Sequence, residues 1–256
     1  MTLKMDKKFI SFCIITIGKD LEKLNLCINS IKLTLRKSWG RSYEIIIVGE
    51  NLSSFKDQKD LILVEETEKR EYLGYKRNLA FEKSTGENLV FCDDDIIFTE
   101  DWVENFINYI SFNADWQIAG NKILLPYGGR YWDRNTYLPS HRMVDYDYES
   151  NSDLFYQTGC FVTAKRSLIE QIRWDGDIPF YATDKGHKYN EDIDFSMRLK
   201  DAGIEIAFDK NNLVWHFDRG YGSNEVGCFR ASVLEEHDCE DFKELIKGCK
   251  NYKINL

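Results

Sequence analysis

Apolar residues near the start of the chain form one short continuous run, and those after it recur at intervals of three or four. The run FISFCIITI at residues 9–17 is rich in β-branched residues and has the length of a buried strand. In the segment that follows, Leu21, Leu24, Ile28 and Ile31 recur at helical spacing. The pattern therefore predicts a strand followed by an amphipathic helix.

The same alternation continues through the first hundred residues. Strands are predicted at residues 43–51, 61–66 and 87–91, where apolar residues are nearly continuous, and a helix at 72–84 is closed by Gly86. Strands that alternate with helices indicate a mostly parallel sheet covered by helices on both faces. We therefore expect an α/β fold.

The second half of the chain is less regular, and longer loops separate its predicted elements. These elements are a helix at 101–112, a strand at 116–125, a strand at 155–164, a helix at 165–174, a helix from Asn190 to Gly203, strands at 204–208 and 212–217, and a terminal helix at 238–253. The polar, aromatic-rich connection at 126–153 is long for a compact domain, and such loops are usually functional or mobile.

Three consecutive aspartates, Asp93, Asp94 and Asp95, follow one of the buried strands. Adjacent carboxylates repel one another, and leaving them unpaired beside a core costs free energy unless a cation lies there. Side chains alternate along an extended strand, so Asp93 and Asp95 are expected to face one side and Asp94 the other. Two carboxylates that face one point can hold a hard divalent cation such as Mg²⁺ or Mn²⁺.

A further acid, Glu50, lies at the end of the predicted strand at 43–51. In open α/β sheets, ligands bind beyond the carboxyl ends of the strands, and both Glu50 and the three aspartates follow such an end. The sequence therefore predicts a ligand site at this edge of the sheet.

Composition narrows the classes of partner. Lys and Arg number 34 against 43 Asp and Glu, which gives a formal charge of -9, so we expect no nucleic-acid partner. No apolar stretch approaches the roughly 18 residues that span a bilayer, and the first residues lack the apolar centre of a signal peptide. The seven cysteines include no C-x-x-C pair, which favours buried thiols in a reducing compartment over a zinc site. We expect a soluble, cytoplasmic protein.

Taken in order, these segments resemble a family 2 glycosyltransferase with the GT-A fold. The resemblance covers residues 9–218 and is carried by five stretches: FCIITIGKD, IIIVGEN, GYKRNLAFEKSTGENLVFCDDDI, TGCFVTAKRSLIEQI with NEDIDFSMRLKDAGIEIAF, and LVWHF. It implies a Rossmann-like, mostly parallel central sheet flanked by helices, in one domain at 1–220. The nucleotide-binding half is expected at 1–98, the acceptor-binding half at 99–220, and a helical extension at 221–256.

The resemblance also implies a nucleotide-sugar donor, which we expect to be UDP-linked, and a divalent cation, Mn²⁺ or Mg²⁺. It makes Asp95 and His216 the metal ligands and assigns the nucleotide to Thr16, Gly18, Glu50, Arg77, Asp93 and Asp94. The chain has Glu50 where the family more often has Asp, and it lacks the common aromatic residue after Thr16. The sequence therefore leaves open which nucleobase the donor carries. The same residues also have explanations that need no ligand. The aspartates and Glu50 could be solvated surface acids, Arg77 could lie on a solvated helix face, and His216 could be a core histidine.

On the acceptor side, the resemblance makes Asp192 the general base, with Glu191 positioning the acceptor, and it implies inversion at the anomeric carbon. Acids in the first turn of a helix are also favoured by the helix dipole alone. The acceptor is expected to be a glycan, a lipid-linked molecule or another hydroxyl compound, and a lipid-linked acceptor would bring the enzyme to a membrane surface. Tyr127, Tyr131, Trp132 and Tyr137 could stack on a sugar or hold the long loop against the core.

Two other functions stay open from the residues. A sugar-phosphate nucleotidyltransferase also combines a parallel sheet, a metal and a nucleotide, but it usually needs a Gly-rich basic loop, and TIGKDLEK has one glycine and one early lysine. A non-catalytic module that binds a nucleotide-sugar or carbohydrate would keep the fold, and turnover of any donor would exclude it.

Overall fold

An eight-stranded mixed sheet forms the centre of the computed structural model, which describes residues 7–69, 71–150, 153–179, 182, 186–217 and 238–252. The strand order is β3-β2-β1-β4-β10-β6-β11-β5. The strands are β1 (Ile10–Ile15), β2 (Tyr43–Gly49), β3 (Leu61–Glu65), β4 (Asn88–Asp93), β5 (Ile96–Phe98), β6 (Ile118–Leu124), β10 (Phe161–Lys165) and β11 (Ala207–His216). The predicted α/β fold with a mostly parallel sheet is confirmed.

Antiparallel neighbours enter the sheet only in its second half. The pairs β1–β2, β2–β3, β1–β4 and β6–β11 are parallel. Strand β10 runs antiparallel to both β4 and β6, and β5 runs antiparallel to β11. Four parallel strands from the first hundred residues therefore point their carboxyl ends to one edge.

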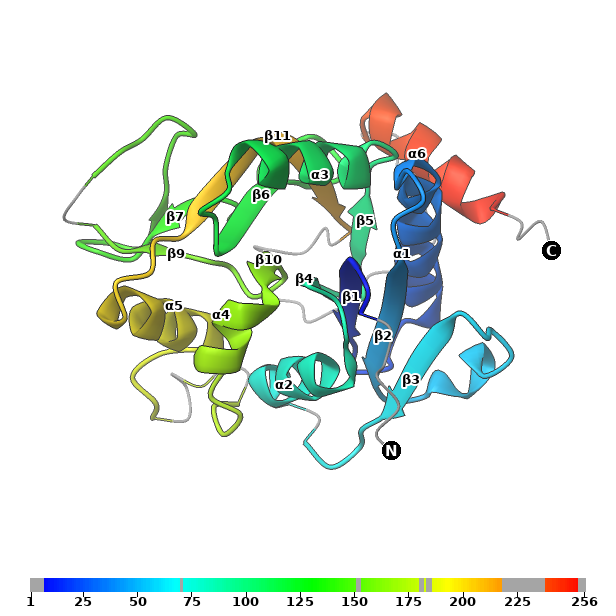
Figure 1. Ribbon diagram of the computed structural model, residues 1–256, viewed down its shortest axis with the longest axis horizontal. Helices are drawn as coiled ribbons and strands as arrows, with labels where there is room; N and C mark the ends of the chain where they lie inside the picture. Colours follow the sequence, from blue (N-terminus) through cyan, green and yellow to red (C-terminus); the bar gives the residue numbers. More distant parts are fainter. Residues whose placement is uncertain are drawn as a thin grey trace.

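Helices cover both faces of this sheet (Figure 1). The helices are α1 (Leu21–Thr34), α2 (Leu73–Lys83), α3 (Trp102–Phe112), α4 (Arg166–Gln171), α5 (Glu191–Asp201) and α6 (Glu240–Lys250). Side chains of β1 alternate between two cores, because successive strand residues point to opposite faces. Phe12 packs with α1 and α3, whereas Cys13 lies in the core that includes α2, α4 and α5.

The terminal helix α6 forms a smaller third core against α1 and the end of β11. Phe242 and Ile246 of α6 are buried with Leu26, Trp215 and Phe217. The helix predicted at 238–253 is therefore present in its central part. The division into a domain at 1–220 and an extension at 221–256 stays a prediction, and residues 218–237, with His237 and Cys228, lie outside the described residues.

Three sequence expectations about strands were wrong. Residues 155–164 form two strands, β9 (Phe155–Tyr156) and β10, because the chain turns at Gly159 and Cys160. Residues 204–217 contain one strand, β11, whose pairing with β6 shifts register between Asp209 and Leu213, where two were predicted. The short strand β5 directly after the aspartates was missed, since it depends on pairing with the distant β11.

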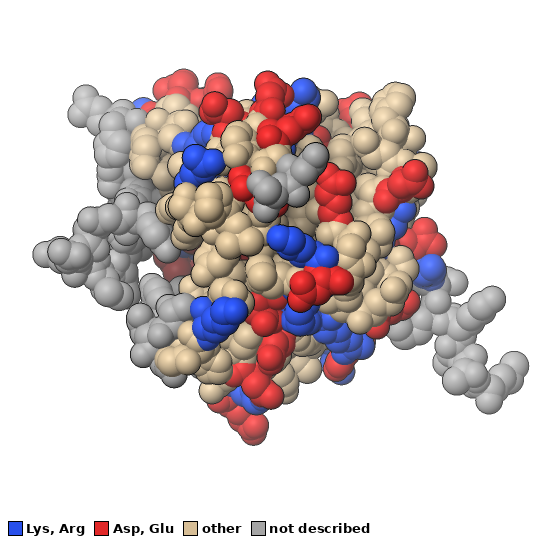
Figure 2. Space-filling model, turned by 90° about the vertical axis from the view of Figure 1, so that its left-hand side faces the viewer, with Lys and Arg blue, Asp and Glu red and all other residues tan. Residues whose placement is uncertain are grey.

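The long connection at 126–153 has structure of its own. It contributes β7 (Asn135–Thr136) and β8 (Arg142–Met143), which pair with β9 in a small antiparallel sheet. This sheet lies beside α5 at the left of Figure 1, and Figure 2 views the molecule from that side, where acidic and basic side chains are interspersed. Within the described ranges, no helix is both long and apolar enough to cross a bilayer.

Most of the described cysteines are buried free thiols, as the sequence predicts. Those described in β1, α1, β4, α6 and before β10 are free and buried: Cys13, Cys27, Cys92, Cys160 and Cys249. Burial raises the pKa of the Cys13 and Cys92 thiols well above the usual value, so they stay protonated and act as small apolar groups.

Candidate active site

The predicted ligand residues of β1, β2 and β4 meet at one edge of the sheet because these strands are parallel and adjacent. Ile15, the last residue of β1, pairs with Val48 of β2 on one side and with Asp93 of β4 on the other. Thr16 and Glu50 each follow the end of their strand: Thr16 lies next to Asp94, and Glu50 lies one strand further along the same edge, beside Gly18. Ligand sites of open α/β sheets form at such an edge.

A hydrogen-bonded loop joins the ends of β1 and β4. The Thr16 hydroxyl, which is buried, donates to Asp94 Oδ2, and it accepts from the Gly18 amide at 2.9 Å. Asn51 Nδ2 donates to the Gly18 carbonyl at 3.1 Å, which ties this loop to the end of β2. Thr16 and Gly18 therefore fix the backbone around the aspartates, in addition to any contact they make with a ligand.

Gly18 is required by this close approach. Its φ is +67°, and a Cβ added there would lie 2.5 Å from the Glu50 carbonyl oxygen. We expect Gly18→Ala to lower the free energy of unfolding by about 1–3 kcal/mol, because an L residue is strained at this φ and the contact is backbone. Chemical denaturation measures this, with Gly40→Ala as the control: Gly40 also has a positive φ, but its Cβ would meet nothing within 4 Å. Equal losses in both variants would contradict a role for the Glu50 contact.

The aspartates do not continue the strand. β4 ends at Asp93, and Asp94 and Asp95 form a turn that leads into β5. The expected alternation of side chains was therefore wrong, because the backbone is not extended after Asp93. Each carboxylate has a different partner: Asp93 lies 3.6 Å from Arg77 Nη2, Asp94 accepts from Thr16, and Asp95 lies between Lys23 and His216.

Burial changes the protonation of two of these acids. Burial raises the pKa of Asp93 well above its usual value, and the Arg77 guanidinium opposes this rise. Burial and the neighbouring Asp95 raise the pKa of Asp94 to about 7, whereas its bond from Thr16 lowers it. An acidic edge of this kind favours a bound cation, which would stabilise the charged carboxylates.

Asp95 and His216 are brought together by the pairing of β5 with β11. His216 pairs with Ile96, and the Phe217 amide donates to the Asp95 carbonyl at 2.8 Å. His216 Nε2 lies 3.5 Å from Asp95 Oδ1, and the Tyr131 ring stacks on the imidazole at 4.0 Å. His216 Nδ1 is buried and has no hydrogen-bond partner among the residues that the structure describes.

These two residues fit a divalent ion that takes its other ligands from a substrate. Two atoms bound to one ion at about 2.0–2.2 Å can lie close to the observed separation after a small side-chain rotation. No third His, Cys, Asp or Glu joins them to form a metal-binding cluster among the described residues. Mg²⁺ is commonly held by one or two protein side chains together with substrate phosphates, so a pair of ligands suffices for such an ion.

Arg77 lies beneath the site and connects its two halves. The side chain is 1% exposed, and Nη1 contacts Glu191 Oε1 at 3.1 Å while Nη2 donates to the Gly159 carbonyl at 2.8 Å. The same guanidinium lies next to Asp93. Helix α2 thus supplies a buried cation between the carboxylate at the end of β4 and the first turn of α5. The nucleotide contact that the sequence predicts for Arg77 stays a prediction.

Asp192 is held by backbone amides at the start of α5. Its Oδ1 accepts from the Ile193 amide at 2.8 Å and its Oδ2 from the Gly159 amide at 3.3 Å. Burial and the adjacent Glu191 raise the pKa of Asp192 to about 7, and the two amides partly offset the rise. A carboxylate that titrates near neutral pH suits general-base chemistry. Asp194, by contrast, pairs with Arg198 of the same helix at 2.8 Å, as expected for a helix-surface acid.

Two residues near the site were not found from the sequence. Lys23 of α1 places its ammonium 3.6 Å from Asp95 Oδ2, and Gly159 supplies both a carbonyl to Arg77 and an amide to Asp192. Lys23 lies in the first turn of α1, directly after the loop that follows β1. This position in the sequence was the one feature that could have indicated that it is near the site. The aromatic loop is partly pinned to the protein, since Tyr131 stacks on His216 and Trp132 lies against His141.

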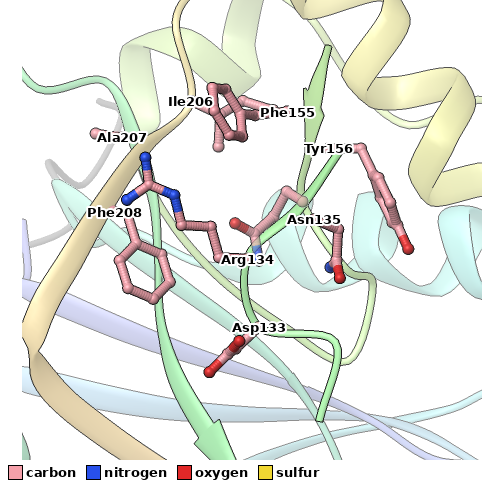
Figure 3. Close-up of a pocket in the computed structure, with 9 residues that line it drawn as sticks. Asp133, Arg134, Asn135, Phe155, Tyr156, Ile206, Ala207 and Phe208 are labelled. Atoms are coloured by element: carbon pink, nitrogen blue, oxygen red, sulfur yellow. The ribbon is translucent and has the colours of Figure 1, made fainter. Parts of the chain in front are cut away.

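One cavity in the described structure is too small for a sugar, and it does not lie at the edge that carries the aspartates. It has a volume of about 20 Å³, which is room for about one water, and it lies at the start of β11, whereas His216 lies at the end. Figure 3 shows Arg134 in this cavity between Phe155 and Phe208. A larger cavity of about 250 Å³ lies beside the first turn of α5, where Asp194 and Tyr189 line it.

Comparison with known proteins agrees with the fold. The model of the family described as Glycosyl transferase family 2 matches residues 11–173, which is more than half of the chain. No curated protein matches the chain significantly in sequence.

Two solved structures show the likeness in three dimensions. The crystal structure of GalNAc-T7 with UDP, GalNAc and Mn²⁺ has a TM-score of 0.60 and 14% identity, and it covers 83% of this chain. The crystal structure of residues 1–349 of S. aureus TarS has a TM-score of 0.53 and 12% identity, and it also covers 83% of this chain. The chain spans only 44% of the first and 59% of the second, and identities this low show the fold alone.

Proposed function

Because the chain belongs to glycosyl transferase family 2, we propose that it is a glycosyltransferase with a nucleotide-sugar donor, and that it uses a divalent ion on Asp95 and His216 and a general base at Asp192. Family membership favours this function over a sugar-phosphate nucleotidyltransferase. Turnover of any donor would exclude the other alternative, a non-catalytic module. The acceptor is proposed to be a hydroxyl compound.

The observation that carries the metal proposal is the pair formed by Asp95 and His216. These are a carboxylate and an imidazole 3.5 Å apart, at the edge where α/β sheets bind ligands. An imidazole ligand favours Mn²⁺ over Mg²⁺. When bound, the ion would neutralise the charge that develops on the diphosphate as the glycosidic bond breaks. The protein itself would hold the nucleotide through the loop of Thr16 and Gly18 and the end of β2 at Glu50.

UDP is the nucleotide we propose. The structurally similar GalNAc-T7 structure contains UDP with Mn²⁺, which supports this choice by analogy of fold. Glu50 at the tip of β2 can accept hydrogen bonds from ribose hydroxyls or from a uracil N–H.

Asp192 is proposed to take the proton of the acceptor hydroxyl while that oxygen attacks the anomeric carbon. The bond between this carbon and the diphosphate oxygen breaks in the same step, so a single displacement inverts the anomeric centre. Gly159 and Ile193 hold the carboxylate in place through their amides. Glu191, which contacts Arg77, is proposed to position the acceptor.

Calorimetric titration with UDP, GDP and CDP tests the donor site. In the presence of Mn²⁺ we expect UDP to bind at least tenfold more tightly than in EDTA, and Asp95→Asn to remove this gain because the amide is a far weaker metal ligand. Asp115→Asn is the control, since Asp115 is an exposed acid before β6, at the opposite edge of the sheet. If no nucleoside diphosphate binds, or if Mn²⁺ and Asp95 have no effect, the proposed donor site is wrong.

A further inference from the structure

Lys23 occupies an unusual position for a lysine. It lies in the first turn of α1 and is 9% exposed, although lysines normally extend their ammonium groups into water. A positive charge in the first turn of a helix is also disfavoured by the helix dipole. Its backbone is fixed, because the Lys23 amide donates to the capping Asp20 carboxylate at 3.0 Å. Burial of the ammonium and its position in the first turn both cost free energy, so a favourable interaction is expected to offset them.

The contact that Lys23 makes is a loose one. Its ammonium lies 3.6 Å from Asp95 Oδ2, which is an ion-pair distance but too long for a hydrogen bond. Two other buried basic residues near this edge, both in α2, are held by protein groups. Lys76 Nζ donates to the Thr16 carbonyl at 2.8 Å, and Arg77 bridges Glu191 and Gly159. Of Lys23, Lys76 and Arg77, Lys23 therefore has the longest contact and can change partners at the smallest cost.

Asp95 cannot serve Lys23 and a metal ion equally well. In the proposed function, the Asp95 carboxylate binds the ion. The Lys23 ammonium then loses its partner, and its positive charge lies close to that of the ion. A diphosphate that joins the ion supplies the negative charge that restores the balance. A lysine ammonium is a common phosphate ligand, because it is a compact charge with three donors.

We propose that Lys23 binds the diphosphate of the donor and, before the donor arrives, occupies Asp95 and weakens metal binding. The inference rests on the proposed function, since it needs a nucleotide and an ion at this edge. It adds an order of events: the ion binds tightly only together with the nucleotide, because Lys23 leaves Asp95 for a phosphate oxygen. One residue then has opposite effects on the affinities for the two ligands.

The test is titration of Lys23→Gln with Mn²⁺ alone and with UDP in saturating Mn²⁺. We expect the dissociation constant of Mn²⁺ alone to fall about threefold or more, and that of UDP to rise about tenfold. Lys23→Arg, which keeps the charge, should stay within about threefold of wild type for UDP. Lys32→Gln is the matched control, because Lys32 is a buried lysine of the same helix whose Nζ lies 2.7 Å from Asp60, and it should change neither constant.

The outcomes separate the two proposals. If wild type binds UDP with Mn²⁺ but Lys23→Gln changes neither affinity, or changes both in the same direction, the role of Lys23 is overturned while the donor site stands. If wild type binds no nucleoside diphosphate, the proposed function itself has failed. Should Lys23→Gln not fold, as judged by circular dichroism, Lys23→Met keeps the apolar stem and gives the same measurement.

Discussion

Asp192→Asn is expected to lower kcat by about 10²- to 10⁴-fold, which is the range that a positioned general base contributes. The amide keeps the size of the side chain but cannot take a proton from the acceptor. Because Asp192 is proposed to contact the acceptor and not the nucleotide, the affinity for UDP with Mn²⁺ should stay within about threefold of wild type. Release of the nucleoside diphosphate from the donor measures kcat, and calorimetry measures the affinity.

The dependence of the rate on pH identifies the base. Burial and Glu191 raise the pKa of Asp192 to about 7, so the carboxylate loses its proton only as the pH rises through that value. The base must be deprotonated to act, so kcat should rise with pH up to about 7, level off above it, and fall at lower pH. It is measured at saturating donor and Mn²⁺, because Asp94 of the donor site also has a pKa of about 7. Asp194→Asn is the control, since Asp194 lies in the same turn but pairs with Arg198.

Two results would contradict this role. If Asp192→Asn keeps the inflection near pH 7, another group is the base. If the substitution weakens UDP binding as strongly as it lowers kcat, then Asp192 supports the donor site and does not act in proton transfer.

Arg77→Met is expected to lower the free energy of unfolding by about 3–5 kcal/mol, the usual cost of removing one partner from a buried ion pair. Methionine fills much of the volume but leaves Glu191 and Asp93 without their shared cation and the Gly159 carbonyl without its donor. Chemical denaturation measures the loss.

The control for Arg77 is another arginine with an acidic partner. Arg173 pairs with Glu82 at 2.8 Å, but both side chains are substantially exposed, so Arg173→Met should cost at most about 1 kcal/mol. Arg77→Lys keeps a charge but not the planar fork that reaches Glu191 and Gly159 together, so its loss should be intermediate. A loss below about 1 kcal/mol for Arg77→Met would show that the two acids do not depend on this guanidinium.

The local pattern of the chain determined most of the fold. Continuous apolar runs predicted β1, β2 and β3, and the recurrence of Leu24, Ile28 and Ile31 predicted α1, because each element shows its buried side in its own residues. The same pattern placed the aspartates and Glu50 after parallel strands, which is enough to predict one ligand edge. The family resemblance, carried by the order of these stretches, was confirmed by the match over residues 11–173.

Only the tertiary structure decided which groups face one another at that edge. Asp94 and Asp95 form a turn, so the side chains of the aspartates do not alternate as predicted. The sequence could not show this, because the apolar run before them would be the same if the strand continued. The pairing of β5 with β11 set His216 beside Asp95, and the packing of α2 and α1 buried Arg77 and Lys23 against the acids. These contacts join residues far apart in the chain, and periodicity carries no information about such pairs. The sequence thus determined the elements and their edge, whereas long-range packing determined the charge arrangement on which the proposed chemistry depends.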